Sequence, residues 1–332
     1  MSEQKVRLGS LGLGWWGSEL AKAVERSGEA EIVSCFARGE EGRVGFAGKH
    51  GCRAAGSLEE FLADPEMDGV LIATSHQSHR PLIEQAAGAG KHIFVEKPLT
   101  TTVADGRACV EAASDAGVLL QVGHQRRRMP ANRRIKALLE AGELGDVETV
   151  IAHQSIPNGF RMAKEAWRWD PEQSPLGSMT SLGIHMIDTM HYFVGPIRAV
   201  SAFTRPGRSN PIDEATVLAF EFDSGALGTL TTSFFTPSVN DISVFGTEAA
   251  AYSTAGGAGL AMQKTGENEK DDLALEPFDP VVDELAEFAG AIRGENPVET
   301  DGEVALASIA VLGAAVESAA TGHTVEVSYY RS

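Results

Sequence analysis

One lysine and one helical segment supply the side chains of this sequence that could do chemistry. Lys97 follows a short apolar run of strand type and precedes Pro98, so its ammonium group would lie at the end of a strand. A lysine there can donate a hydrogen bond to an alcohol or carbonyl oxygen and stabilise negative charge on it. The structural alternative is a lysine that simply pairs with its neighbour Glu96.

The second candidate set lies on a helix predicted over residues 178–193. Ser181, His185 and Asp188 follow one another at helical spacing and therefore share one face. The opposite face is apolar and carries Leu182, Met186, Met190 and Phe193. A neutral imidazole can accept the proton of an alcohol, and a carboxylate can orient the imidazole or bind a hydroxyl. Because a lone histidine on a helix is often structural, the spacing leaves both interpretations open.

Two histidine patterns suggest a metal at first sight. His185, Asp188 and His191 form His-x-x-Asp-x-x-His, but this spacing turns the third side chain away from the first two. His76 and His79 lack a third ligand of known geometry. We therefore expect no metal site.

A glycine-rich turn predicts a dinucleotide site. Gly12, Gly14 and Gly17 form Gly-x-Gly-x-x-Gly between a predicted strand at 5–11 and the helix that follows. In this context the first glycine makes the turn, the second admits a pyrophosphate and the third allows close packing of helix and strand. Trp16 either covers the cofactor or packs in the core. A purely structural turn is the alternative.

The end of the second predicted strand, at 31–37, bears on which nicotinamide cofactor is bound. NAD-binding proteins usually place a carboxylate about 20 residues beyond the glycines to hold the ribose 2′-hydroxyl. Here Arg38 stands at that end, and a guanidinium suits a 2′-phosphate. We predict NADP, with NAD as the alternative because Glu40 and Glu41 follow closely. Arg38 as a solvated loop charge is the structural interpretation.

Composition limits the partners. The chain has 332 residues, enough for about two domains, and a formal net charge of −18. This charge disfavours nucleic acid and anionic membranes, and it outweighs the local basic run at residues 126–128. Because three cysteines are an odd number without paired metal spacing, we expect reduced thiols. No stretch looks long and apolar enough to cross a bilayer. We expect a cytoplasmic protein with a small-molecule substrate.

The hydrophobic patterns predict two domains. Residues 1–122 alternate strands and helices, as in a doubly wound parallel α/β (Rossmann) sheet. Residues 123–332 contain six β segments joined by hairpin turns, which predicts an α+β domain with a mostly antiparallel, open-faced sheet. We expect a mobile loop over 256–272, and helices at 281–293 and 302–321. The apolar side chains expected on the open face are Val217, Leu230 and Phe234. Such a face predicts a homodimer or homotetramer.

Several motifs together resemble the Gfo/Idh/MocA family of NAD(P)-dependent oxidoreductases. They are the glycine turn, Ile72-Ala73-Thr74 with His79, Glu96-Lys97-Pro98, Trp167-Arg168 with Asp170, and Gly183-Ile184-His185-Met186-Ile187-Asp188. The resemblance covers nearly the whole chain. It implies that Lys97 and His185 are catalytic and that the cofactor is held by the three glycines with Trp16, Arg38, Thr74, His79, Glu96 and Lys97.

The resemblance also implies a substrate site and a reaction. Asp188, Ser181, Trp167 and Arg168 look like substrate-binding residues, since a tryptophan face suits a sugar ring and an arginine suits hydroxyls. Many members carry Asp where Ser181 stands, and serine cannot hold a charge. The implied reaction is hydride transfer between nicotinamide and a secondary alcohol or ketone of a polyhydroxylated substrate such as a sugar. The alternatives are a dihydrodiol or semialdehyde dehydrogenase and a non-catalytic nicotinamide-binding regulator.

Overall fold

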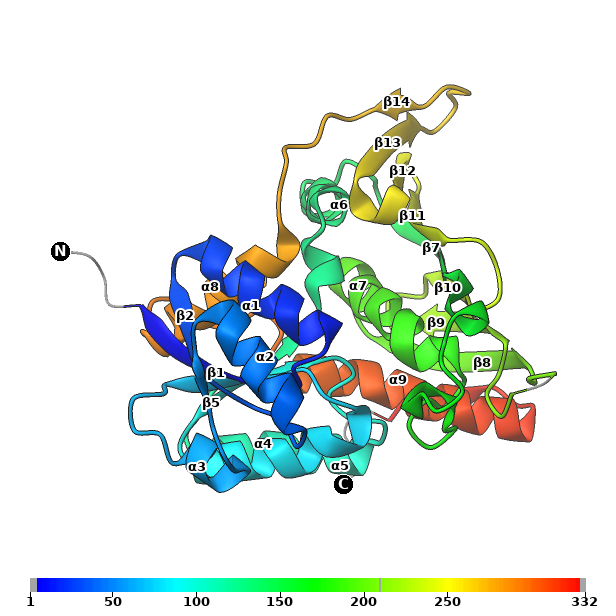
Figure 1. The fold of residues 1–332 in the computed structure, drawn as a ribbon. Helices are drawn as coiled ribbons and strands as arrows, with labels where there is room; N and C mark the ends of the chain where they lie inside the picture. The colour runs from blue at the N-terminus through cyan, green and yellow to red at the C-terminus, as the bar shows by residue number, and fades with distance from the viewer. Residues whose placement is uncertain (1–4, 209, 329–332) are drawn as a thin grey trace. The chain divides into compact units, whose positions relative to one another are not determined.

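The computed structural model of the protein describes residues 5–208 and 210–328, and Figure 1 shows its ribbon. The chain forms two compact units. The first comprises residues 1–100, 104–125 and 279–305, and the second comprises 101–103, 126–278 and 306–332. The domain boundary predicted at 122/123 lies close to residues 125/126, where the chain passes from the first unit to the second. The return of residues 279–305 to the first unit was not foreseen, and it follows from the packing of α8 (Pro280–Ile292) on α1 (Trp15–Ser27).

The first unit alternates strands and helices. Its strands are β1 (Val6–Leu11), β2 (Ala30–Phe36), β3 (Arg53–Ala54), β4 (Gly69–Ile72), β5 (His92–Glu96) and β6 (Leu120–Gly123). Its helices are α1 (Trp15–Ser27), α2 (Glu40–His50), α3 (Leu58–Leu62), α4 (His79–Gly88), α5 (Val103–Asp115) and α8 (Pro280–Ile292). The strands pair in parallel in the order β3-β2-β1-β4-β5-β6. This order confirms the doubly wound Rossmann sheet.

Helices cover both faces of this sheet. One apolar cluster joins α1 and α8 to the sheet through Leu20, Val24, Leu285 and Phe288. On the other face, α3, α4 and α5 contribute side chains that include Phe61, Ile83 and Cys109. All of these side chains are buried, as expected for a parallel sheet enclosed by helices.

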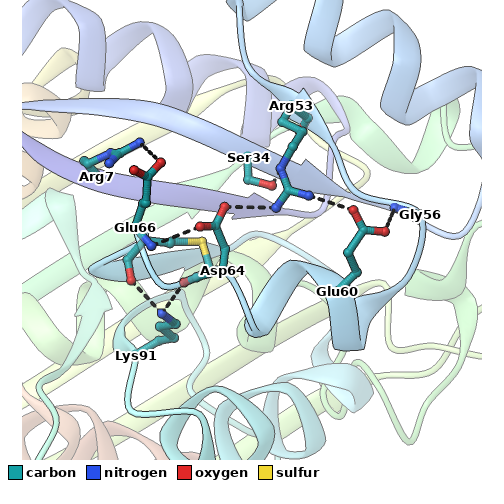
Figure 2. Close-up of polar contacts among 9 residues, drawn as sticks. Arg7, Ser34, Arg53, Gly56, Glu60, Asp64, Glu66 and Lys91 are labelled. Carbon is teal, nitrogen blue, oxygen red and sulfur yellow. Dashed lines mark hydrogen bonds and ion pairs between the residues drawn. The ribbon is translucent and has the colours of Figure 1, made fainter.

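An exposed polar network ties the β3 edge to the start of β4, as Figure 2 shows. Arg53 donates to Glu60 at 2.6 Å and to Asp64 at 2.9 Å, while Arg7 donates to Glu66 at 2.8 Å. The buried ammonium of Lys91 donates to the Asp64 carbonyl at 2.6 Å. Exposed ion pairs contribute little to stability individually, so this network serves mainly to fix the local loop geometry.

The second unit is built on a nine-stranded sheet in the order β14-β13-β12-β11-β7-β10-β9-β8-β15. Its strands are β7 (Val147–Ser155), β8 (Ile197–Arg205), β9 (Ala215–Phe222), β10 (Leu227–Ser233), β11 (Val239–Gly246), β12 (Ala249–Thr254), β13 (Gly259–Lys264), β14 (Asp271–Asp272) and β15 (Val325–Glu326). Its helices are α6 (Pro130–Glu140), α7 (Ile184–Val194) and most of α9 (Gly302–Thr321). The predicted antiparallel pairing is confirmed except between β7 and β10, which run parallel.

One face of this sheet is packed and the other is open. The packed face forms a cluster with α6, α7 and α9, including Ile135, Ile187 and Leu312. The prediction that Leu230 and Phe234 are exposed is wrong, because they are 0% and 2% exposed and belong to the interior. Alternation along the strands instead exposes Ile151, Phe203, Val217 and Leu227.

Three further expectations need correction. The loop expected at 256–272 contains β13 and β14, and β13 pairs with β12 over its whole length. The long helices α5 and α6 were not anticipated.

The stretch Gly302–Thr321 is long and apolar enough to span a membrane by length and composition. Side chains of this helix, among them Ile309, Val311 and Leu312, are buried in the interior of the protein, which is the pattern of a core helix.

Candidate active site

The glycine turn leaves β1 and enters α1 at the point where the strand order reverses. A methyl group on Gly12 would lie 2.3 Å from the Ala73 carbonyl oxygen, and one on Gly17 would lie 1.9 Å from the Gly12 carbonyl oxygen. Gly12 also has a φ of +90°, in the region that favours glycine. Both glycines are therefore required by the protein's own packing.

Gly14 differs from the other two glycines. Apart from its neighbours in the chain, no atom of the residues that the structure describes lies within 4 Å of the position that its Cβ would occupy, and its φ of −72° is accessible to any residue. No protein atom thus explains a glycine at this position, whereas a pyrophosphate approaching the start of α1 does. The geometry of the turn fits a dinucleotide, whose nicotinamide ring would accept or donate hydride.

The two tryptophans that follow Gly14 have different surroundings. Trp16 packs against the core cluster of α1 and α8, which favours the core-packing interpretation. Trp15 is 75% exposed at the first position of α1, and its ring centre lies 5.4 Å from that of Trp16. Trp15 was not among the residues predicted to lie near the cofactor, although it directly follows Gly14, the glycine at which the pyrophosphate is expected.

The loop between β2 and α2 presents Arg38 to solvent. Its side chain is exposed, and Gly39, the residue before α2, offers no capping side chain. No carboxylate lies between the end of β2 and Arg38, since only Ala37 separates them. This position is compatible with the predicted contact to a 2′-phosphate.

Glu96 and Lys97 lie at the carboxyl end of β5, in the same parallel sheet as the glycine turn. Thr74 follows β4, the strand between β1 and β5, and its methyl carbon lies close to Gly12. Burial raises the pKa of the Glu96 carboxyl to about 7, although the adjacent Lys97 ammonium and the Trp16 indole act in the opposite direction. The glycine turn, Thr74 and the Glu96-Lys97 segment all follow the carboxyl ends of parallel strands, which is where ligands of open α/β sheets bind.

His79 is buried between the segments that follow β4 and β5. Its ring is 0% exposed, and Nδ1 lies 3.0 Å from the Pro98 carbonyl oxygen and 3.3 Å from that of Leu99. Burial lowers the pKa of the imidazole, which favours the neutral ring. These contacts give His79 a positioning role under the segment that follows Lys97, while the predicted contact of His79 with the cofactor stays a prediction.

His185 lies near the start of α7, directly after a stretch of different helical geometry. Residues Met179–Gly183 form a π-helix, so the regular spacing predicted for 178–193 does not run through Ser181. His185 is 4% exposed and Ser181 is 8% exposed. π-helical turns occur often at functional sites, because they alter which way neighbouring side chains project.

Asp188 forms a buried ion pair that sequence reasoning missed. Arg127 Nε donates to Asp188 Oδ2 at 2.9 Å, and Arg127 Nη2 donates to Oδ1 at 2.5 Å. The side chains are 6% and 1% exposed. The Arg127 guanidinium also lies 5.1 Å from the centre of the Tyr192 ring. Both carboxylate oxygens accept from Arg127, so this pair positions α7, while a contact between Asp188 and the substrate stays a prediction.

Trp167 and Arg168 form a stacked pair. The Arg168 guanidinium lies 4.3 Å from the centre of the Trp167 ring, in the short helix η4 (Trp167–Trp169). Burial lowers the pKa of Arg168. Asp170, the remaining residue of this motif, instead accepts a hydrogen bond from Gln173 at 3.0 Å.

No group of three His, Cys, Asp or Glu side chains within residues 5–208 and 210–328 is placed to hold a metal ion. A hollow of about 590 Å³ on the second unit is lined by α6, α7 and β7, with Lys136, Glu148 and Phe193 among its residues. None of the candidate site residues lines it. The candidate residues are distributed over both units. The glycine turn, Arg38, Thr74 and Lys97 belong to the first unit, and His185 belongs to the second.

Models of known protein families match segments in both units. A model described as the oxidoreductase family, NAD-binding Rossmann fold, matches residues 6–124, and the GFO/IDH/MocA C-terminal domain matches residues 132–252. The chain belongs to the Gfo/Idh/MocA family. As a member it is an NAD(P)-dependent oxidoreductase, so the alternative of a non-catalytic regulator is set aside.

Individual relatives span the full length of the chain. The 1,5-anhydro-D-fructose reductase of Ensifer adhaerens is 27% identical, over 97% of this chain and 98% of the relative. The D-xylose 1-dehydrogenase (NADP(+)) 2 of Haloferax volcanii is 30% identical, over 96% and 98%. A solved structure assigned as an NADPH-dependent oxidoreductase from Desulfitobacterium hafniense superimposes with a TM-score of 0.93 at 29% identity and covers 98% of each chain.

Proposed function

We propose that the protein transfers hydride between NADP and a secondary alcohol or ketone of a small polyhydroxylated molecule, a sugar or sugar derivative. The observation that carries this proposal is the open space at Gly14, after β1 of the same parallel sheet whose strand β5 carries Lys97 at its carboxyl end, within a chain whose full-length relatives act on sugars. Arg38, together with the NADP and NADPH named for two of the three relatives, supports NADP over NAD.

In this proposal Lys97 holds the reacting oxygen. Its ammonium donates a hydrogen bond to the substrate oxygen and stabilises the negative charge that develops there when the proton and the hydride do not move together. Pro98 and the buried His79 ring fix the turn beyond Lys97. Glu96, whose pKa burial raises to about 7, is partly neutral near pH 7 and therefore only partly offsets the lysine charge.

His185 is the proposed proton acceptor for alcohol oxidation and the donor for the reverse reaction. The Arg127–Asp188 pair fixes α7 one turn further along and so limits how far the imidazole can shift. Ser181 contributes a hydroxyl but no charge, so it is proposed as a substrate hydrogen-bonding group rather than a member of a charged relay.

The stacked Trp167 and Arg168 are proposed as substrate-binding groups. A tryptophan face packs well on the apolar side of a sugar ring, and a guanidinium held against that ring is oriented to bind hydroxyl or carboxylate oxygens. Substrates without several hydroxyl groups, such as simple semialdehydes, would use this pair poorly. We also propose a cytoplasmic location and assembly through the open sheet face.

A cofactor and substrate screen tests the proposed function. Fluorescence titration of the unmutated protein with NADPH and NADH measures both dissociation constants. Nicotinamide absorbance is then followed with NADP⁺ or NAD⁺ across aldoses, anhydrosugars, cyclitols, dihydrodiols and semialdehydes. Tighter binding of NADPH and turnover of a sugar-type alcohol are expected. Tighter binding of NADH would refute the NADP preference, and turnover confined to dihydrodiols or semialdehydes would refute the substrate class.

A further inference from the structure

Arg43 contacts the loop between β2 and α2 from the first turn of α2. Its side chain turns back toward the strand, and Nη1 donates to the Ala37 carbonyl oxygen at 3.1 Å and to the Arg38 carbonyl oxygen at 3.4 Å. Its own carbonyl oxygen accepts a weak hydrogen bond from the Cys35 thiol at 3.5 Å. The same residue therefore fixes both the end of β2 and the loop that carries Arg38.

These contacts change the charge that the loop presents. Two carbonyl oxygens at adjacent positions would repel an approaching phosphate, but here both accept hydrogen bonds from a cation. The exposed Glu40 and Glu41 stand at the start of α2 and oppose an anion. Arg38 alone would leave this loop net negative, whereas Arg38 and Arg43 together balance the two carboxylates.

We propose that Arg43 is a positioning residue for cofactor selection, which acts through the loop that carries Arg38 and favours a 2′-phosphate on the adenosine ribose. This inference rests on the proposed NADP preference. Arg38 contacts the phosphate, and Arg43 holds the Arg38 backbone from behind while adding a second positive charge. The charge acts on the phosphate of NADPH, whereas the 2′-hydroxyl of NADH is neutral.

The ratio of the two cofactor affinities separates this role from simple support of the loop. A residue that only packs the loop would affect NADPH and NADH alike, because both share the adenosine that lies against it. A residue that selects for phosphate affects NADPH more, and its effect declines as salt screens the charge. The substitution Arg43→Lys keeps the charge but removes the guanidinium, whose Nη1 donates to both carbonyl oxygens.

The test measures dissociation constants of NADPH and NADH, at low and high salt, for the unmutated protein, Arg43→Met and Arg43→Lys. Arg53→Met is the matched control, because Arg53 also joins β3 to its surroundings through two hydrogen bonds (Figure 2). We expect Arg43→Met to weaken NADPH binding by about tenfold at low salt and NADH binding by less than about threefold. Arg43→Lys should fall between Arg43→Met and the unmutated protein, and Arg53→Met should leave the ratio unchanged.

Each outcome bears on the inference. Equal weakening of both cofactors in Arg43→Met, or an unchanged ratio, would overturn it. If Arg43→Met does not fold, as judged by thermal unfolding, Arg43→Lys decides, since its ratio must fall by about threefold. Failure of the proposed NADP preference is visible separately, because it appears in the unmutated protein as tighter binding of NADH.

Discussion

At the scale of single residues, burial controls the charge of Glu96. The carboxyl is 7% exposed, and its Oε1 lies 2.9 Å from the position that a Cβ on Gly123 would occupy. Burial raises its pKa from the ordinary 4.5 to about 7. Between these two values the unfolded chain loses the proton while the folded protein keeps it, so stability falls as pH rises through this window.

This linkage predicts the behaviour of Glu96→Gln. The free energy of unfolding of the unmutated, cofactor-free protein should decline relative to that of the variant between the two pKa values, 4.5 and about 7, by up to about 3 kcal/mol. Above and below that window the difference should be constant. Urea unfolding at a series of pH values measures it. Parallel pH curves for the two proteins would show that Glu96 is ionised normally in the folded state.

Local sequence predicted some of these residues and not others. The roles of Gly12, Gly14 and Gly17 follow from their own spacing, and the structure distinguishes them by what a methyl group would meet. The partner of Asp188 could not be predicted, because Arg127 lies 61 residues earlier and belongs to a run of three arginines that gave no sign of which one pairs with Asp188. The spacing of residues in the sequence predicts which side chains share a face of one helix or strand. This pair instead depends on how η2 (Gln125–Arg128) packs on α7.

At the scale of elements, the Arg127–Asp188 pair joins η2 to α7. Removing either partner takes the bidentate ion-pair contact away from a buried charge, a change that costs about 3–5 kcal/mol for buried pairs. Arg127→Met and Asp188→Leu should each destabilise the protein by that order, and the double variant should lose far less than the sum. Denaturant unfolding of the four proteins measures the coupling. Additive losses would mean that the two side chains do not depend on each other.

The elements themselves were predicted where their pattern is strong. β9 was found with its bounds because it is rich in β-branched and aromatic residues and is followed by the turn Asp223-Ser224-Gly225. β13 was missed, since Gly, Ala and Met residues around it look like a loop and its stability comes from pairing with β12. The π-helix before α7 was missed, because the regular helical spacing assumed for residues 178–193 cannot distinguish a π-helical turn from an α-helical one.

At the scale of the whole molecule, the open face of the second sheet predicts assembly. Phe203 is 72% exposed and lies opposite the 39% exposed Val217 on the neighbouring strand. Leu227 and Ile151 extend the apolar surface to β10 and β7. Exposed apolar surface of this kind usually marks an interface, so we expect a dimer or tetramer through this face.

Two substitutions test the interface. Phe203→Asp should dissociate the assembly, because it places a carboxylate in an apolar contact, and light scattering at micromolar concentration reports the mass. Phe278→Asp is the control, since Phe278 is 47% exposed but lies outside the sheet. A monomeric mass for the unmutated protein would contradict the predicted assembly, and dissociation by Phe278→Asp alone would place the interface elsewhere.

The central claim is that Lys97 and His185 carry out one hydride and proton transfer together. Its most direct test is single-turnover hydride transfer with the substrate found by the screen, measured for Lys97→Ala, His185→Ala, the double variant and Ser181→Ala, each checked for folding. Each of the first two should slow transfer by roughly 10² to 10⁴, the double variant by much less than the product, and Ser181→Ala by about tenfold or less. Full transfer rates in both Lys97→Ala and His185→Ala would contradict the claim.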